Sequence, residues 1–491
     1  MNVKLPAPGP NLKSFDEQKV GFFRFRRLNG HYLLTTETGK FAYLNPQDFD
    51  RFVQGRLGKT SAAYRDLKSK GFLREHLDFP GIVKDWRKAN SFLWMAPSLH
   101  MIVVTLRCNY TCVYCHAASV KMTEKHFDMT KATAEKVVDR IFESPSPVIA
   151  IEFQGGEPLV NYPVVQHIVE YALEKNKTVK KDLLINMVSN MSLMDEKKLG
   201  WLMEHGVNFC TSIDGPAALH DKNRIYTGGA SHAVSVRWFK EIYKRTAKKM
   251  FRIDALLTAT RSALPLHREV VDEYLKIGAR GIYLRSLNPF GFAGKTWEAI
   301  GYTPEEFLTF YRKAVDYIIG INLKGKPFVE QYAKICLTKI LNNEDPGFID
   351  MRSPYGLGGL AYNYDGGVYL ADEGRMVAKM GDESFRLGNV FENTYKETVN
   401  HETMRAVVSS SLLEGQTECS WCAYKPYCGQ SPIHNYIEQG DIYARTPTSN
   451  WHLIHQGIFD YLFMKIKDPK ALKVFRSWVS KRKPRTLYAR N

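Results

Sequence analysis

Residues 107–115 read Arg-Cys-Asn-Tyr-Thr-Cys-Val-Tyr-Cys, so Cys108, Cys112 and Cys115 stand in a C-x3-C-x2-C spacing on one short stretch. Cubane iron–sulfur clusters usually take a cysteine at every iron, and three thiolates leave one iron open to a substrate. A structural zinc knuckle is one alternative, but zinc favours paired C-x2-C motifs with a further nitrogen or sulfur donor, and only His116 lies nearby. Three unrelated core thiols are the other alternative. The spacing favours a cluster with one open iron.

This stretch, including Tyr114 before the last cysteine, resembles the signature of the radical S-adenosylmethionine (SAM) superfamily. In that superfamily the open iron binds the amino and carboxylate groups of SAM, and an electron cleaves the sulfonium to a 5′-deoxyadenosyl radical. The resemblance implies a [4Fe-4S] cluster on Cys108, Cys112 and Cys115, SAM as the second cofactor, and Tyr114 among the residues around them.

The composition is that of a globular protein, with 44% hydrophobic and 24% charged residues, and 491 residues predict about two or three domains. No uninterrupted apolar run reaches membrane-spanning length, and residues 1–15 are Pro-rich and polar rather than a secretory signal. We therefore expect a cytoplasmic protein without a membrane partner. Its eight cysteines are then ligands or free thiols rather than disulfides.

The net charge of +17 raises the expectation of an acidic partner such as nucleic acid. The charge is spread along the chain, however, and the one compact patch, residues 481–485, is expected to be a mobile basic tail. No nucleic-acid-binding motif accompanies it, so nucleic acid is not an expected partner.

Residues 96–330 alternate short apolar runs with amphipathic stretches. The expected strands are 100–106, 148–153, 183–188, 207–213, 253–259 and 281–287, and the expected helices lie near 130–143, 163–175, 195–205, 233–248, 265–277 and 304–320. This alternation predicts an α/β fold with a parallel sheet and right-handed crossovers. Because there are six units rather than the eight of a closed barrel, we expect a partial (β/α)6 TIM-like barrel, the fold of the radical SAM superfamily. Its open side would admit a peptide.

Residues 1–95 predict a small α+β unit. A hairpin is expected around the turn Glu37-Thr38-Gly39, followed by a helix that opens at residues 45–48 and a second helix over 61–70. This order resembles the winged-helix-like domains that bind leader peptides in peptide-modifying enzymes. A structural cap on the barrel is the alternative.

Residues 331–455 abandon the alternation and are dominated by Gly, Asp, Tyr and three clustered cysteines. We expect little core there, so metals or docking on a neighbour would hold the region. Residues 456–491 are expected to form an amphipathic helix, over about 455–466, and the basic tail.

Gln-Gly-Gly-Glu-Pro at 154–158 follows the second expected strand. Two glycines let the backbone approach a ligand closely, and Glu157 can accept a hydrogen bond from an ammonium group. The stretch resembles the superfamily's Gly-Gly-Glu-Pro motif, which implies that Gly155, Gly156 and Glu157 bind the amino group of SAM. Ser189, after the third strand, lies where relatives place polar cofactor contacts, although a simple turn also explains it.

After the fourth strand, Ser212, Asp214 and Arg224 resemble the Ser-x-Asp-Gly-Pro…His…Arg pattern of the peptide-modifying subgroup. The resemblance implies that Ser212 and Arg224 contact SAM, with the guanidinium on its carboxylate. Asp214 is alternatively a turn carboxylate. Arg285, at the end of the sixth strand, is either a further cofactor contact or one half of a barrel-rim ion pair.

Cys419, Cys422 and Cys428 stand in a C-x2-C-x5-C-G spacing that resembles the auxiliary-cluster (SPASM/twitch) extension of radical peptide maturases. Several further stretches, spread over nearly the whole chain, resemble the radical SAM maturase of the His-Xaa-Ser peptide system. Relatives carry cysteine where this chain has Tyr355, Ala371 and Pro432, and a further cysteine expected near residues 451–452 is absent. One auxiliary cluster thus loses most of its ligands together and leaves Cys336 as an orphan. The second keeps Cys419, Cys422 and Cys428 and has a fourth ligand elsewhere (Cys336, His434 or His452), or none. An auxiliary Fe-S cluster, a zinc ion and a metal-free knuckle all remain open.

Asp372 follows the position of the lost cysteine at Ala371. In the related sulfatase-maturing enzymes a carboxylate in this place takes a proton from the substrate, so the resemblance implies Asp372 as the catalytic base. A loop carboxylate paired with Arg375 is the alternative.

The sequence therefore predicts a radical SAM enzyme that modifies a ribosomally made peptide or protein, with flavodoxin or ferredoxin as reductant and with room for a second maturase subunit. One rival is oxidation of Ser or Cys to formylglycine, as in sulfatase maturation. Others are a non-catalytic partner protein, against which the intact triad argues, and a nucleic-acid-binding protein, which rests on charge alone.

Overall fold

A computed structural model describes residues 15–246 and 253–480 of the chain. The basic segment at residues 481–485, expected to be a mobile tail, lies outside the described residues.

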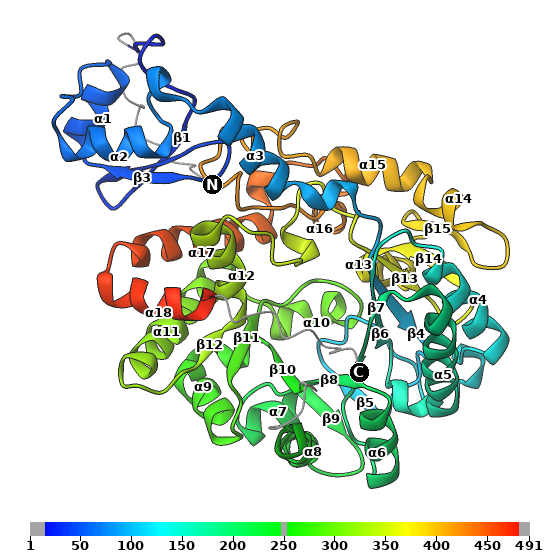
Figure 1. Ribbon diagram of the computed structural model, residues 1–491. Coiled ribbons are helices and arrows are strands. Elements are labelled where there is room, and N and C mark those ends of the chain that lie inside the picture. Colours follow the sequence, from blue (N-terminus) through cyan, green and yellow to red (C-terminus); the bar gives the residue numbers. More distant parts are fainter. Residues whose placement is uncertain (1–14, 247–252, 481–491) are drawn as a thin grey trace.

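Within these residues, ten strands form one sheet in the order β12-β11-β10-β8-β7-β6-β4-β13-β14-β15 (Figure 1). Neighbours from β12 to β13 run parallel, whereas β14 and β15 are antiparallel additions. The bounds are β4 Leu99–Val103, β6 Val148–Gln154, β7 Asp182–Val188, β8 Val207–Ser212, β10 Ile253–Thr258, β11 Gly281–Arg285, β12 Val329–Glu330, β13 Gly359–Tyr362, β14 Gly367–Leu370 and β15 Arg386–Asn389. The predicted α/β fold with a parallel sheet is confirmed.

Amphipathic helices join the parallel strands and cover the outer face of the sheet (Figure 1). In α4 the Thr130 hydroxyl caps the first turn by accepting from the Thr133 amide. Ala134, Val137 and Val138 then recur at helical spacing and are buried. The others are α5 Tyr162–Val179, α6 Glu196–Glu204, α8 Ser231–Thr246, α9 His267–Lys276 and α11 Pro304–Leu323, with α4 at Lys131–Phe142. They agree with the expected helices to within about one turn.

The N-terminal unit is a three-stranded antiparallel sheet, β1 Arg24–Leu28, β2 His31–Thr35 and β3 Phe41–Leu44, followed by helices. The expected hairpin turn lies between β2 and β3, and the expected helices are α1 Pro46–Val53 and α2 Ala62–Lys70. Leu34, Phe49 and Leu67 belong to a buried cluster separate from the main core. Figure 1 shows the unit at the edge of the barrel, with α3 (Phe79–Ala89) leading back toward β4.

The region after the barrel is better packed than expected. Tyr355, Tyr362, Tyr424 and Tyr427 are each 1% exposed and belong to the same core cluster as the barrel strands. The expectation of little core was wrong because these tyrosines lie in turns and short elements, without the periodicity that marks a core-facing helix or strand. The helices after the barrel are α12 Gln331–Asn342, α13 Ala371–Ala378, α14 Tyr395–Val399, α15 Glu402–Ser410 and α16 Pro432–Gln439, whereas α10 Phe292–Ile300 follows β11 within the barrel.

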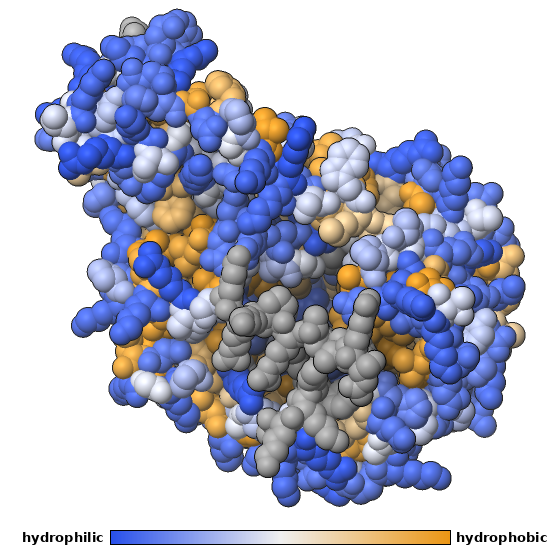
Figure 2. Space-filling view, viewed as in Figure 1, coloured by the Kyte–Doolittle hydropathy of each residue, from blue (hydrophilic) through white to orange (hydrophobic). Residues whose placement is uncertain are grey.

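The chain then forms two helices, α17 Asn450–Ile466 and α18 Pro469–Val479, where one over about 455–466 was expected. Ser449 caps α17, so the helix begins upstream of its apolar stretch. None of the helices in the described ranges combines the length and apolar content that a membrane span requires. Figure 2 shows a mainly hydrophilic outer surface on the N-terminal unit.

Candidate active site

The three clustered thiols lie on the loop that follows β4. Cys112 ends a short strand, β5 (Tyr110–Cys112), which pairs with β9 (Arg224–Tyr226) so that Cys112 faces Arg224. The Cys115 amide donates to the Cys112 carbonyl at 3.1 Å and closes the turn. Cys108, Cys112 and Cys115 are free, partly exposed thiols. The loop is therefore held by sheet pairing.

Burial raises the pKa of Cys112 to about 12 and also raises that of Cys108, while the Arg224 guanidinium opposes the shift at Cys112. Thiolates are the metal-binding form, so iron binding here must release protons. Across residues 15–246 and 253–480, no three His, Cys, Asp or Glu side chains are grouped to hold a single metal ion. A cubane cluster binds each thiolate through a different iron, and its ligands do not converge on one point as zinc ligands do.

Gly155 and Gly156, at the end of β6, pack against the start of the cysteine loop. The Gly156 amide donates to the Thr105 carbonyl at 2.9 Å, and the Glu157 amide donates to the Arg107 carbonyl at 2.8 Å. A Cβ at Gly156 would lie 2.2 Å from the Arg107 carbonyl oxygen. The sequence predicted that the two glycines let the backbone approach a ligand closely. In the structure, the backbone at these glycines closely approaches the loop that carries the cysteines.

Glu157 is 1% exposed and joins the ends of β6 and β7. Its carboxylate accepts from the Ser189 hydroxyl at 2.8 Å, the Asn190 amide at 2.7 Å and the Leu159 amide at 3.0 Å. Burial raises the pKa of Glu157, and these donors oppose the rise. Ser189 therefore supports Glu157 directly.

Asn190 follows Ser189 at the end of β7, where the sequence predicted polar contacts to the cofactor. Its side-chain amide donates to the Cys108 sulfur at 3.7 Å and to the Asn109 side-chain oxygen at 3.1 Å. Asn190 links the end of β7 to the first cysteine.

Arg224 is connected through Tyr114 to Asp214. The guanidinium donates to the Tyr114 hydroxyl at 3.0 Å, and this hydroxyl lies 2.8 Å from both carboxylate oxygens of Asp214. Asn223 also donates to Asp214, so the carboxylate caps a buried network rather than an exposed turn. The Nε of Arg224 is buried and has no hydrogen-bond partner among the described residues. A ligand acceptor fits this orphaned donor.

Ser212 and Arg285 occupy strand ends as expected. Ser212 ends β8, is partly exposed and pairs with Leu256 of β10. Arg285 ends β11 and lies within electrostatic range of Asp350, Asp372 and Glu373. Both residues therefore lie where parallel strands of the sheet end.

Asp372, the expected base, is the second residue of α13 rather than a loop residue. It is 8% exposed, and its carboxylate accepts from Arg375 Nε at 2.8 Å, the pairing named as the alternative. Its neighbour Glu373, which was not anticipated, accepts from the Tyr355 hydroxyl at 3.1 Å. Burial raises the pKa of Glu373 to about 7, and Asp350 and Asp372 reinforce the rise. A signal for Glu373 was its position directly after Asp372.

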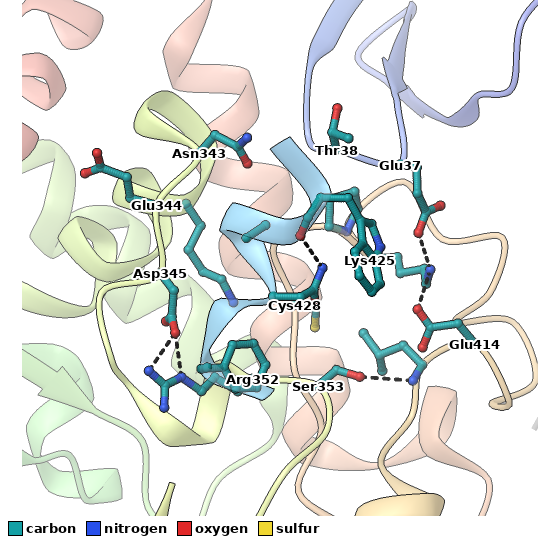
Figure 3. Close-up of a pocket in the computed structure, with 17 residues that line it drawn as sticks. Glu37, Thr38, Asn343, Glu344, Asp345, Arg352, Ser353, Glu414, Lys425 and Cys428 are labelled. Atoms are coloured by element: carbon teal, nitrogen blue, oxygen red, sulfur yellow. Dashed lines mark hydrogen bonds and ion pairs between the residues drawn. The ribbon is translucent and has the colours of Figure 1, made fainter. Parts of the chain in front are cut away.

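Cys419, Cys422 and Cys428 lie on a stretch of turns between α15 and α16. The Cys422 amide donates to the Cys419 carbonyl at 3.1 Å, and the Cys428 amide donates to the Tyr424 carbonyl at 3.0 Å. Cys428 also lines a cavity of about 90 Å³ with Lys425, Lys339 and Arg352 (Figure 3).

Of the three candidates for a fourth ligand, Cys336 lies within electrostatic range of Cys428 and is fully buried in α12. His434 packs edge-on against the Phe290 ring at 4.8 Å, and its electrostatic neighbours include Arg285 and His116. His452 bonds Gln456 at 3.2 Å along α17. Tyr355 and Ala371, at two of the lost cysteine positions, are 1% exposed and fill core space.

A sequence model of the radical SAM superfamily matches residues 102–261. An uncharacterized protein of Methanocaldococcus jannaschii is 30% identical over 234 residues, 46% of this chain and 76% of that protein. The cysteine-type anaerobic sulfatase-maturating enzyme of Clostridium perfringens is 25% identical over 330 residues, 64% of this chain and 83% of the enzyme.

Among solved structures, Streptococcus suis SuiB bound to its precursor peptide SuiA aligns with a TM-score of 0.52 and 14% identity. The alignment covers 88% of this chain and 98% of SuiB, so the likeness of fold extends over most of the molecule.

Proposed function

This chain belongs to the radical SAM superfamily of enzymes, which use a [4Fe-4S] cluster and SAM, and from that premise we propose that it modifies side chains of a ribosomally made peptide. The observation that carries the proposal is the cysteine loop on β4, paired with β9 and supported by Glu157, Asn190 and Arg224. A chain of that kind has a catalytic site at the edge of a partial barrel, open to a large substrate.

In this proposal Cys108, Cys112 and Cys115 hold the cluster. Gly155, Gly156, Glu157, Ser189, Ser212, Arg224 and Tyr114 surround SAM. Bound together, cluster and SAM would supply radical chemistry for the removal of a hydrogen atom from the substrate. The protein's own part is to fix the loop and to place a buried positive charge opposite Cys112.

A peptide substrate is supported by two of the similar proteins, one a sulfatase-maturating enzyme and the other a structure with its precursor peptide bound. Among the described residues, β1 and β3 are the edge strands of the three-stranded N-terminal sheet, and an extended leader peptide can add to such an edge. Flavodoxin or ferredoxin is the proposed electron donor, a second maturase subunit is a further proposed partner, and the cytoplasm, where thiols stay reduced, is the proposed setting.

Oxidation of a Ser or Cys residue to formylglycine is the second candidate, and the similarity to the Clostridium perfringens enzyme favours it. In that candidate Asp372 accepts a proton. Its ion pair with Arg375 occupies one of its carboxylate oxygens.

The test uses anaerobically reconstituted full-length protein with SAM, a reductant and a short peptide encoded beside its gene. Modification and 5′-deoxyadenosine should appear together in the wild type and vanish in C108A/C112A/C115A. C210A, on β8 and outside the loop, is the matched control and should retain both. SAM cleavage by the triple variant would refute the cluster assignment, whereas cleavage without any peptide product would refute the peptide assignment. An aldehyde product would select the second candidate.

A further inference from the structure

Four carboxylates lie around the end of β11, at the mouth of the partial barrel. Arg285, the last residue of β11, is within electrostatic range of three of them, Asp350, Asp372 and Glu373. The fourth, Glu152 on β6, is within range of both Arg285 and Asp372. In the sheet, β6 and β11 are separated by β7, β8 and β10, so the group spans the interior of the barrel (Figure 1). We term Glu152, Asp350, Asp372 and Glu373 the interior carboxylates.

The interior carboxylates outnumber the cations beside them. Asp372 pairs with Arg375 at 2.8 Å, and this is the one direct ion pair that the group forms with described residues. Arg285 makes no ion pair and no side-chain hydrogen bond with any described residue. Four carboxylates thus face two guanidinium groups. Burial raises the pKa of Glu373 to about 7, and repulsion from Asp350 and Asp372 adds to the rise. A buried excess of negative charge is costly unless a cation joins it.

His434 points to a ligand at the same place, independently of the carboxylates. Its side chain lies on α16, which packs on α13, the helix that carries Asp372 and Glu373. His434 is 5% exposed and within electrostatic range of Arg285. Neither of its ring nitrogens has a hydrogen-bond partner among the described residues. A neutral imidazole has one donor and one acceptor, and buried polar atoms of this kind normally have partners. A bound molecule would supply them.

The molecule that fits is an organic cation on a peptide. In the described ranges, no three His, Cys, Asp or Glu side chains are grouped to hold a single metal ion. An ammonium or guanidinium group has several donors that point in different directions, so it can bond carboxylates that do not converge on one point. Arg285, which has no ion pair, can donate to a main-chain carbonyl of the same peptide.

This place lies beside the cysteine loop. Glu152 stands two residues before the end of β6, and β6 leads directly into Gly155 and Gly156. On the other side, the chain that follows β11 contacts the loop, because the Phe292 amide donates to the Cys115 carbonyl at 2.9 Å. A side chain held by the interior carboxylates is therefore next to the loop to which the cluster is assigned.

We propose that the interior carboxylates form a subsite for a positively charged side chain, a lysine ammonium or an arginine guanidinium, of the peptide substrate. Glu152, Asp350 and Glu373 accept its N–H groups, whereas Asp372 stays paired with Arg375. The inference rests on the proposed function, because it names a class of residue that the peptide carries at the site of modification.

Binding of small probes tests the proposal. Reconstituted enzyme with SAM is titrated at about pH 8, where Glu373 is ionised, with Nα-acetyl-lysine amide and with the neutral Nα-acetyl-norleucine amide. The lysine probe should bind with a Kd on the order of 1 mM, and the norleucine probe about tenfold more weakly. Equal affinities, or no binding of the lysine probe up to about 20 mM, would overturn the proposal. Equally tight binding of norleucine amide with a free α-amino group would also overturn it, because the site would then take a peptide amino terminus.

Variants locate the binding. E373Q and D350N should each weaken binding of the lysine probe about tenfold and leave the affinity for SAM unchanged. E383Q is the matched control, because Glu383 also accepts from a tyrosine hydroxyl, that of Tyr369 at 2.9 Å, but is exposed. Should D350N fail to fold, E373Q alone decides. Equal probe affinities of E373Q and E383Q would refute the subsite, and loss of SAM affinity in E373Q would assign the carboxylates to the cofactor instead.

The subsite and the proposed function can fail separately. A wild type that modifies its peptide but does not bind the lysine probe contradicts the subsite alone. A wild type that binds the lysine probe through Glu373 but modifies no peptide contradicts the proposed function and retains the cation site.

Discussion

At the residue scale, Tyr114 connects parts of the site that are distant in the sequence. Its hydroxyl joins Arg224, opposite Cys112, to the buried carboxylate of Asp214. A buried guanidinium and a buried carboxylate are costly unless their hydrogen bonds are met. Tyr114 therefore acts as the bridge that keeps the positive charge beside the cysteine loop.

Y114F should reduce SAM cleavage about 10- to 100-fold. In this variant Arg224 and Asp214 lose their shared hydrogen-bond partner, and the cysteine loop is no longer held in its orientation. Y110F, on the same loop, is the matched control: the Tyr110 hydroxyl has no hydrogen-bond partner among the described residues. Cleavage rates per bound iron would be compared. Equal rates for the two variants would exclude the bridging role.

Glu373 makes a pH-dependent contribution to stability. Its pKa is raised to about 7, so the folded state binds more protons than the unfolded state above the usual value of 4.5. Such a group stabilises the fold fully below its unfolded pKa, and this contribution is lost as pH rises through about 7.

E373Q mimics the neutral acid, so its stability should not fall as the pH rises through about 7. At about pH 8 the free energy of unfolding of E373Q should exceed that of the wild type by on the order of 3 kcal/mol. Near pH 5 the two free energies should match. The amide oxygen can still accept from Tyr355. Chemical denaturation at several pH values measures the difference. Parallel curves for the two proteins would contradict the prediction.

At the element scale, the N-terminal sheet has two kinds of contact. One face carries Leu34 in the unit's own core, whereas Phe41 and Tyr43 of β3 turn to α17. The Phe41 ring lies 5.3 Å from that of Phe463, and the Tyr43 hydroxyl donates to the Phe463 carbonyl at 2.6 Å. The unit thus has the contacts of a structural cap, whatever it binds.

Deletion of residues 1–95 should lower both peptide affinity and Tm. The deletion removes the proposed peptide-binding unit and uncovers Phe463 and residues 419–429. SAM cleavage per bound iron should persist, since the cysteine loop and its supporting network all lie beyond residue 98. Calorimetry, iron analysis and peptide titration on both proteins separate these effects. Unchanged peptide affinity would show that the N-terminal unit is a structural cap and does not bind the peptide.

At the scale of the whole molecule, the sheet does not stop at the barrel. β13, from the region after the barrel, pairs in parallel with β4, the strand that leads into the cysteine loop. Buried tyrosines of the same region share the barrel's core. The fold of residues 350–450 therefore depends on hydrophobic docking and strand pairing.

Removal of iron by a chelator under anaerobic conditions should accordingly leave one cooperative unfolding transition, with Tm lowered by no more than about 5 °C. Circular dichroism and limited proteolysis of the iron-free protein provide the measurement. Selective proteolysis of residues 350–450 after iron removal would mean that a metal, rather than the core, holds this region.

The sequence by itself determined the barrel and its cysteine loop. Alternating apolar runs and amphipathic helices are local patterns, so strands β4, β6, β7, β8, β10 and β11 and helices α4, α5, α6, α8, α9 and α11 followed from periodicity. The spacing of Cys108, Cys112 and Cys115 is also a local signal, because all three cysteines lie within eight residues of sequence. Gly155, Gly156 and Glu157 were found for the same reason.

Only the tertiary structure decided which partners these residues have. The bond from Asn190 to Cys108, the pairing of Cys112 with Arg224 and the place of Glu373 beside Tyr355 join residues 18 to 112 positions apart in sequence. The hydrogen bond from Thr35 in the N-terminal hairpin to Ala423 joins residues 388 positions apart. Hydrogen bonds and core packing depend on three-dimensional proximity, which no local pattern encodes, and so the support of each site appeared only with the fold.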